Sequence, residues 1–144
     1  MTELTLADDQ MSDEFSVETA DVIHVAAFRA ALRSFLRTSE QIAQANGLTP
    51  QRHLLLLMIK GAPDGSERST VTELSRRLQL AQHTVTELVG RTVRAGLIRR
   101  TASAEDRRVV YLSLTAKGER KLADSFRDLD AERRALIAVA RTGP

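Results

Sequence analysis

The 144-residue sequence contains no cysteine and no tryptophan, and aromatic residues make up only 3% of it. Without cysteine there can be no disulfide, no thiolate metal site and no thiol-based redox sensing. No apolar run approaches the roughly 20 residues that span a bilayer, and the acidic first twenty residues differ from a secretory signal. We therefore expect a soluble, cytoplasmic protein of one domain, with an aliphatic core and no membrane partner.

The net charge is +2, but the charged residues are distributed unevenly along the sequence. Residues 1–20 contain six acids and no lysine or arginine, so residues 1–17 are expected to form a flexible acidic arm. Residues 71–114 contain eight arginines, four acids and no lysine. Because a guanidinium makes planar, bidentate contacts with phosphate or carboxylate, this segment is a candidate for anion binding. The ordinary alternative is a solvated surface.

The first third of the chain has the spacing of two helices. Residues 18–46 carry two apolar stripes, which indicates a helix covered on more than one side, and Gly47 is expected to end it. Thr49 and Pro50 then supply a typical N-cap and first position for a second, largely buried helix.

The next two helices are short and separated by about three residues, which is the helix-turn-helix pattern. Thr72 is expected to cap the first of them, which ends near Leu78. The second covers residues 82–95. Its expected inner face consists of Val85, Leu88, Val89 and Thr92.

A β-hairpin and one long helix are expected to complete the chain. Residues 97–100 are short and extended, residues 101–108 form a polar loop, and residues 109–114 alternate like a half-buried strand. Thr115 is expected to cap a single final helix that runs to about residue 140. The fold class is therefore mainly α with a small β-hairpin wing, a winged helix-turn-helix.

Four stretches, in this order, resemble the MarR family of bacterial transcription regulators over about residues 28–122. The most specific is the last, which fits the family's wing signature with Asp106, Arg108, Leu114, Thr115 and Gly118. The four stretches are GLTPQRHLLLLMIKG, TVTELSRRLQL, HTVTELVGRTVRAGLIRR and DRRVVYLSLTAKG.

The resemblance implies a role for the wing, residues 98–114. In the family the wing tip reaches the minor groove of DNA, where a narrow groove attracts arginine. Arg108 would be the inserted residue, and Asp106 would support it through a bidentate pair before DNA arrives. Arg107 would contact a phosphate. The ordinary alternative is a surface ion pair that closes a hairpin.

The resemblance likewise implies that helix 82–95 is the recognition helix and enters the major groove by its N-terminus. Glutamine there suits adenine, and threonine can contact the thymine methyl group. Thr72 and Thr84, near helix N-termini, are candidates for phosphate contacts. The other expected DNA-binding residues are Gln82, His83, Thr86 and Arg91.

Four residues depart from the family pattern. Gln79 stands where glycine is frequent in the turn, and Ala81 stands where a serine or threonine would cap the recognition helix. Glu87 would repel phosphates unless it meets a cytosine or pairs with Arg91. Gly90 disfavours the helix, and close approach of the backbone to DNA is one functional reason for it.

Residues 49–114 form the expected DNA-binding lobe. The regions on either side of this lobe are expected to form a homodimer. These regions are an N-terminal dimerisation helix in residues 18–48 and a C-terminal dimerisation helix in residues 115–144. The family continues into a further helix that completes the dimer, and the single final helix expected here implies a smaller or rearranged interface.

A small anionic or aromatic effector is a further expectation from the family. Arg29, Arg33 and His53 are candidates to hold it, and interhelical salt bridges or plain surface positions explain them equally. The three histidines lack metal-ligand spacing, and no catalytic constellation or cofactor motif is present, so we expect no metal, no cofactor and no enzyme activity.

The sequence thus predicts a sequence-specific DNA-binding transcriptional regulator, a repressor by preference, that binds a palindromic operator in double-stranded DNA as a homodimer. The alternative is a winged-helix protein-interaction module that has lost DNA readout.

Overall fold

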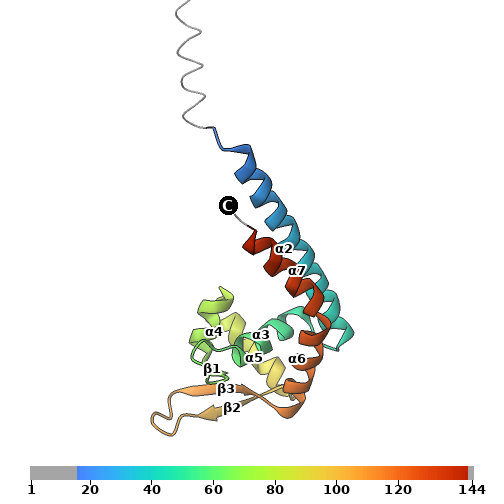
Figure 1. Cartoon of the computed structure of the whole chain (residues 1–144). Helices are drawn as coiled ribbons and strands as arrows, with labels where there is room; N and C mark the ends of the chain where they lie inside the picture. Colours follow the sequence, from blue (N-terminus) through green and yellow to red (C-terminus); the bar gives the residue numbers. More distant parts are fainter. Residues whose placement is uncertain (1–15, 143–144) are drawn as a thin grey trace, which may run out of the picture. The chain divides into compact units, whose positions relative to one another are not determined.

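The computed structural model describes residues 16–142. The acidic arm expected over residues 1–17 therefore lies outside the described residues, except for its last two. The observed elements are α2 (Thr19–Ala45), α3 (Pro50–Lys60), β1 (Arg68–Ser69), α4 (Val71–Leu78), α5 (Gln82–Arg94), β2 (Ile98–Ala102), β3 (Val110–Leu114), α6 (Ala116–Asp128) and α7 (Asp130–Arg141) (Figure 1).

The chain divides into two compact units. One combines the described residues up to Leu36 with those from Glu132 onward, and so contains the start of α2 and nearly all of α7. The other spans Arg37–Ala131 and contains the remaining elements, which form the mainly helical winged helix-turn-helix that the sequence predicts.

The sheet of the second unit has three antiparallel strands in the order β1-β3-β2. In the hairpin of β2 and β3, Ile98 pairs with Leu114 and Ala102 pairs with Val110. The sequence reading missed β1, because a strand of two residues is too short to show a periodicity.

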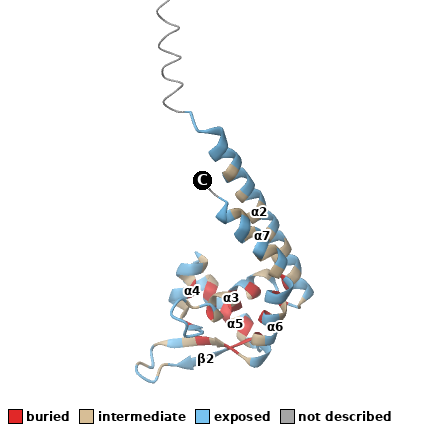
Figure 2. Cartoon of the chain, viewed as in Figure 1, coloured by how far each residue is buried: buried red, intermediate tan, exposed pale blue. Residues whose placement is uncertain are grey.

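The core of this unit lies where α3, α4, α5 and the sheet meet, and Figure 2 shows the buried residues gathered there. The expected inner face of α5 is confirmed, since all four of its residues are buried. Leu112 and Leu114 of β3 are buried as the alternation predicts, while Val110, nearer the wing tip, is exposed. The remaining core residues include Leu55, Leu56, Ile59, Leu74, Leu97 and Ile98.

Two helix starts follow from threonine caps. Thr49 caps α3 as expected, because its hydroxyl accepts a hydrogen bond from the Arg52 N–H at 3.2 Å. The expected cap of α4 at Thr72 is wrong. Thr70 caps this helix in a reciprocal arrangement with Glu73, whose carboxylate accepts from the Thr70 N–H at 3.0 Å. Glu73 therefore completes the cap of α4.

The turn between α4 and α5 has the strain that its residue types predict. Gln79 adopts a left-handed conformation with φ 56° and ψ 43°, which costs a residue with a Cβ about 1 kcal/mol. Ser75 stabilises the turn, because its hydroxyl donates to the Leu80 carbonyl at 2.8 Å and its carbonyl accepts from the Leu80 N–H at 3.1 Å. Ala81 makes no side-chain cap for α5, as expected.

The single final helix expected after Thr115 is observed as two helices. The chain leaves helical geometry at Leu129, which has φ −92° and ψ 3° and is buried, and α7 begins at the next residue. An unbroken apolar pattern does not reveal such a break, which explains the error. The chain therefore continues past α6 into a further helix, which the sequence analysis did not predict.

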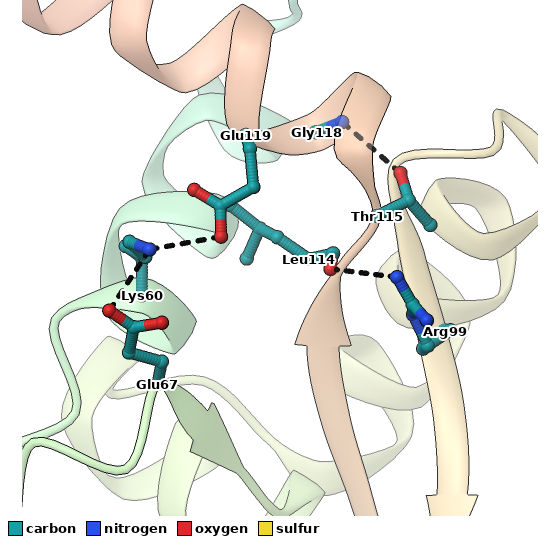
Figure 3. Close-up of polar contacts among 7 residues, drawn as sticks. All are labelled: Lys60, Glu67, Arg99, Leu114, Thr115, Gly118 and Glu119. Atoms are coloured by element: carbon teal, nitrogen blue, oxygen red, sulfur yellow. Dashed lines mark hydrogen bonds and ion pairs between the residues drawn. The ribbon is translucent and has the colours of Figure 1, made fainter.

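The start of α6 is tied to the base of the wing (Figure 3). The Thr115 hydroxyl accepts a hydrogen bond from the Gly118 N–H at 3.1 Å and donates to the Gly96 carbonyl at 2.6 Å. A Cβ on Gly118 would overlap the carbonyl oxygen of Leu97, which joins α5 to β2. Because glycine has no Cβ, the first turn of α6 can pack directly against the Leu97 carbonyl.

Lys60 connects three segments of the same unit (Figure 3). Its ammonium group lies 3.0 Å from a Glu67 oxygen, just before β1, and 3.0 Å from a Glu119 oxygen on α6. The hydrogen bonds to Glu119 and then to Glu67 raise the pKa of Lys60 above its ordinary value. This exposed network joins the end of α3 to β1 and α6.

We predict that Gly118→Ala lowers the free energy of unfolding by about 1–3 kcal/mol, because the new methyl group meets backbone rather than a flexible side chain. Thermal or denaturant unfolding measures this change. Gly90→Ala is the matched control in a helix, since the nearest atom to its Cβ would be 3.6 Å away. It should stabilise the protein by up to about 1 kcal/mol, and equal effects of the two variants would contradict the prediction.

Candidate nucleic-acid interface

The outward face of α5 carries most of the polar residues expected to read DNA. Because the inner face is fixed by the core, Gln82, His83, Thr86 and Arg91 are all exposed, while Thr84 is half-buried. Thr92 can be buried on the inner face because its hydroxyl donates to the Leu88 carbonyl at 2.7 Å. The helix thus presents a continuous polar stripe that no described element covers.

Three expected residues from separate elements come together beside the start of α5. The Gln82 amide nitrogen donates to the Thr72 hydroxyl at 3.3 Å, which joins the first turns of α5 and α4. Thr72 also lines a groove of about 350 Å³ between α4 and the wing, and Arg108 lies on the opposite wall of this groove. Thr72 therefore remains a surface residue of the candidate interface, although it does not cap α4.

The wing tip holds Arg108 in an extended, accessible position. Its side chain is 91% exposed, and its Nε donates to Asp106 Oδ1 at 3.2 Å. The same carboxylate oxygen accepts from the Arg108 N–H at 3.1 Å. The expected bidentate pair is therefore wrong, because one oxygen serves both donors and the terminal guanidinium nitrogens remain available to another partner.

Backbone contacts make the tip a defined turn rather than a loose loop. The Ser103 N–H donates to the Val109 carbonyl at 2.8 Å, and the Val109 N–H donates to the Asp106 carbonyl at 2.9 Å. Arg107 is exposed at the same turn. The tip can therefore carry two adjacent arginines without ordering a long loop first.

Three further arginines have contacts within the folded unit. Arg77 donates to the carbonyls of Met58 at 2.7 Å and Gly61 at 3.3 Å, which ties α4 to the end of α3. Arg91 lies 3.8 Å from Glu87, so the pairing expected for that acid is present. Arg68, which the sequence reading passed over together with β1, lies 3.9 Å above the ring of Tyr111.

The three residues proposed for an effector lie in different environments. Arg29 and Arg33 are exposed on α2, in the first unit, whereas His53 is buried in α3, in the second. Burial lowers the pKa of His53, which favours its neutral form, and its Nδ1 has no hydrogen-bond partner. An effector held by these residues stays a prediction.

Residues 16–142 contain no group of three or more histidine, acidic or cysteine residues placed to hold a metal ion. In the same range, no helix combines the length and the apolar character needed to cross a membrane.

Comparison with known proteins matches residues 46–109 to the model of the MarR family. HTH-type transcriptional repressor MdtR of Bacillus subtilis (strain 168) is 34% identical over 95 residues, which cover 66% of this chain and 56% of the repressor. The matched part thus spans little more than half of that relative.

Solved structures share the fold. YusO from Bacillus subtilis is 26% identical, with a TM-score of 0.56 over 92% of this chain and 81% of YusO. A MarR mutant from E. coli, complexed with operator DNA, is 18% identical, with a TM-score of 0.62 over 83% of this chain and 85% of its own. Members of the MarR family are transcriptional regulators rather than enzymes. The helix-turn-helix, the wing and the wing signature are thus all in place in this chain, and residues 46–109 match the MarR family.

Proposed function

We propose that this protein is a DNA-binding transcriptional regulator, a repressor by preference, that binds a palindromic operator as a homodimer. Its recognition helix, expected over residues 82–95 and observed as α5, would enter the major groove, and its wing, residues 98–114, would enter the minor groove. The observation that carries the proposal is the side chain of Arg108, which is 91% exposed yet held by Asp106 at the wing tip.

The chemistry of each part suits its groove. The hydrogen bond to Thr72 orients the Gln82 amide at the first turn of α5, where a recognition helix meets base edges. A narrow minor groove concentrates negative potential, and arginine is the side chain that exploits it. Arg107 and Arg108 would bring two positive charges there from one ordered turn.

The comparisons support the same proposal. The curated relative is named a transcriptional repressor, and a structural neighbour was solved with operator DNA. DNA is found in the cytoplasm of bacteria, so we expect the protein to act there.

Exposed apolar residues support the homodimer. Val22, Ile23 and Val25 on α2 are each more than half exposed, and Ile137 on α7 is 43% exposed. In the second unit, Phe126 is 48% exposed and lines a groove of about 420 Å³ between α3 and α6. Large apolar residues exposed on each of the two units are candidates for an interaction site, and a second copy of the chain is the partner we propose.

A protein-interaction module is the second candidate, and one observation favours it. Glu87 lies exposed on α5, where its charge disfavours phosphate. Its contact with Arg91 reduces that repulsion, so we place DNA binding first.

We predict protection of an inverted repeat whose half-sites are about 10 bp apart, centre to centre, because two recognition helices in a twofold dimer meet successive major grooves. Footprinting with the purified protein on its own upstream DNA tests this prediction. Protection of one half-site, or of none, would contradict it, and absence of all DNA binding would favour the interaction module.

We predict that Arg108→Ala weakens operator binding by about 1–3 kcal/mol and leaves the melting temperature unchanged, because the side chain contacts solvent rather than the core. Fluorescence anisotropy and thermal unfolding measure the two effects. Asp106→Asn is the matched control, since it keeps the arginine and weakens only its support, and it should cost less affinity. Unchanged affinity for Arg108→Ala would show that this cluster only closes the hairpin.

We predict that Ile23→Asp and Phe126→Asp each shift the protein to monomers, because each would place an unpaired charge in an apolar interface. Light scattering measures the mass, and circular dichroism confirms that the variants remain folded. Gln41→Asp, at an exposed polar position of α2, is the control and should remain dimeric. A dimer that persists in both test variants would place the interface elsewhere.

A further inference from the structure

Gly90 lies in the interior of α5, where glycine destabilises a helix relative to alanine. Neither its conformation nor its packing requires glycine. It is not among the glycines with positive φ, and a Cβ here would meet only Arg94 Nη1 at 3.6 Å and Arg100 Nη2 at 3.9 Å, which are ordinary contact distances. The residue therefore calls for an explanation outside the folded chain.

The two arginines reach this point from different elements. Arg94 belongs to the last turn of α5, and Arg100 is the third residue of β2, which packs beside α5. Arg100 is two residues after the buried Ile98, so both lie on the same face of the sheet, the face that α5 covers. Both guanidinium groups therefore lie within 4 Å of the same point above Gly90.

Neither guanidinium has a carboxylate partner in the part of the chain that the structure describes. Glu87, the acid one turn before Gly90, contacts Arg91 instead. Two positive charges that converge without a counter-charge repel each other, and an anion placed between them removes the repulsion. The two guanidinium groups could therefore bind an anion above Gly90, where no side chain occupies the space.

We propose that Arg94 and Arg100 together hold one phosphate of the DNA backbone above Gly90. The missing side chain at Gly90 lets the phosphate approach the helix surface, and the two guanidinium groups supply donors that suit phosphate oxygens. This inference rests on the proposed function and adds two binding residues to it. Such a contact fixes the position of the protein on the duplex and carries no sequence information.

The position of the pair suits this role. The first turn of α5 would read the major groove and the wing tip the minor groove, and a sugar-phosphate backbone separates these two grooves. β2 runs from the end of α5 toward the wing tip, so Arg100 lies between the two reading elements. A residue there is placed to meet the intervening backbone.

The test measures the salt dependence of DNA binding for Arg94→Gln, Arg100→Gln and the double variant. The probes are a duplex that carries the footprinted sequence and a duplex of random sequence. Each phosphate contact contributes about 0.9 to the slope of log affinity against log salt. Because one phosphate is shared, the double variant should lose about one unit of slope rather than two, with a similar fold-loss of affinity on both duplexes.

Arg99→Gln is the matched control. It removes the same charge from the neighbouring residue, which faces the opposite side of the sheet and is turned toward the Leu114 carbonyl at 3.5 Å (Figure 3). Its slope should equal that of the unmodified protein. Gly90→Ala gives a second readout, because it should raise the melting temperature and yet weaken binding to both duplexes.

Each contrary result has a separate meaning. If the unmodified protein binds both duplexes but the double variant keeps its slope, or loses two units, the shared phosphate site is wrong and the proposed function stands. If Arg94→Gln lowers only the melting temperature, Arg94 serves the C-terminal dipole of α5 instead. If the unmodified protein binds neither duplex, the proposed function and this inference both fail.

Discussion

The winged-helix unit depends on one close approach, that of Gly118 in the first turn of α6 to the carbonyl of Leu97, which joins α5 to β2. Thr115 strengthens the same junction, because its hydroxyl both caps α6 and donates to Gly96. The junction holds together the end of the recognition helix, the start of β2 and the end of β3. The direction of the wing relative to α5, and with it the geometry of the candidate interface, follows from this contact.

The recognition helix combines several features that disfavour its own formation. The turn before it requires a left-handed Gln79, its N-cap residue Ala81 provides no side-chain cap, and Gly90 lies in its interior. Each of these features costs a helix about 1 kcal/mol. The four buried residues of its inner face offset these costs through packing against the core. Tertiary contacts rather than local propensity therefore stabilise α5, which leaves its outer face available for contacts with DNA.

Five arginines of residues 71–114 fall into two groups according to the atoms that they contact. Arg77 donates to two backbone carbonyls, and Arg91 lies near Glu87. Arg108 is held by a single carboxylate oxygen, while Arg94 and Arg100 converge without an acid in the described part of the chain. Charge counting along a sequence cannot separate these groups, because the difference lies in partners from distant segments. The proposed interface draws on the second group and on the exposed Arg91, whereas Arg77 belongs to the scaffold.

The sequence by itself determined the order of the main helices, the inner face of α5, the cap of α3 and the alternation of β3, because these depend on spacing and on neighbours within a few residues. The acid–arginine cluster before β3 was equally visible, since it is contiguous. Only the tertiary structure decided the third strand, the break at Leu129 and the single-oxygen support of Arg108. It alone brought Gln82 to Thr72 and Arg100 to Arg94, because these pairs join segments whose contact depends on how α4, α5 and the hairpin pack.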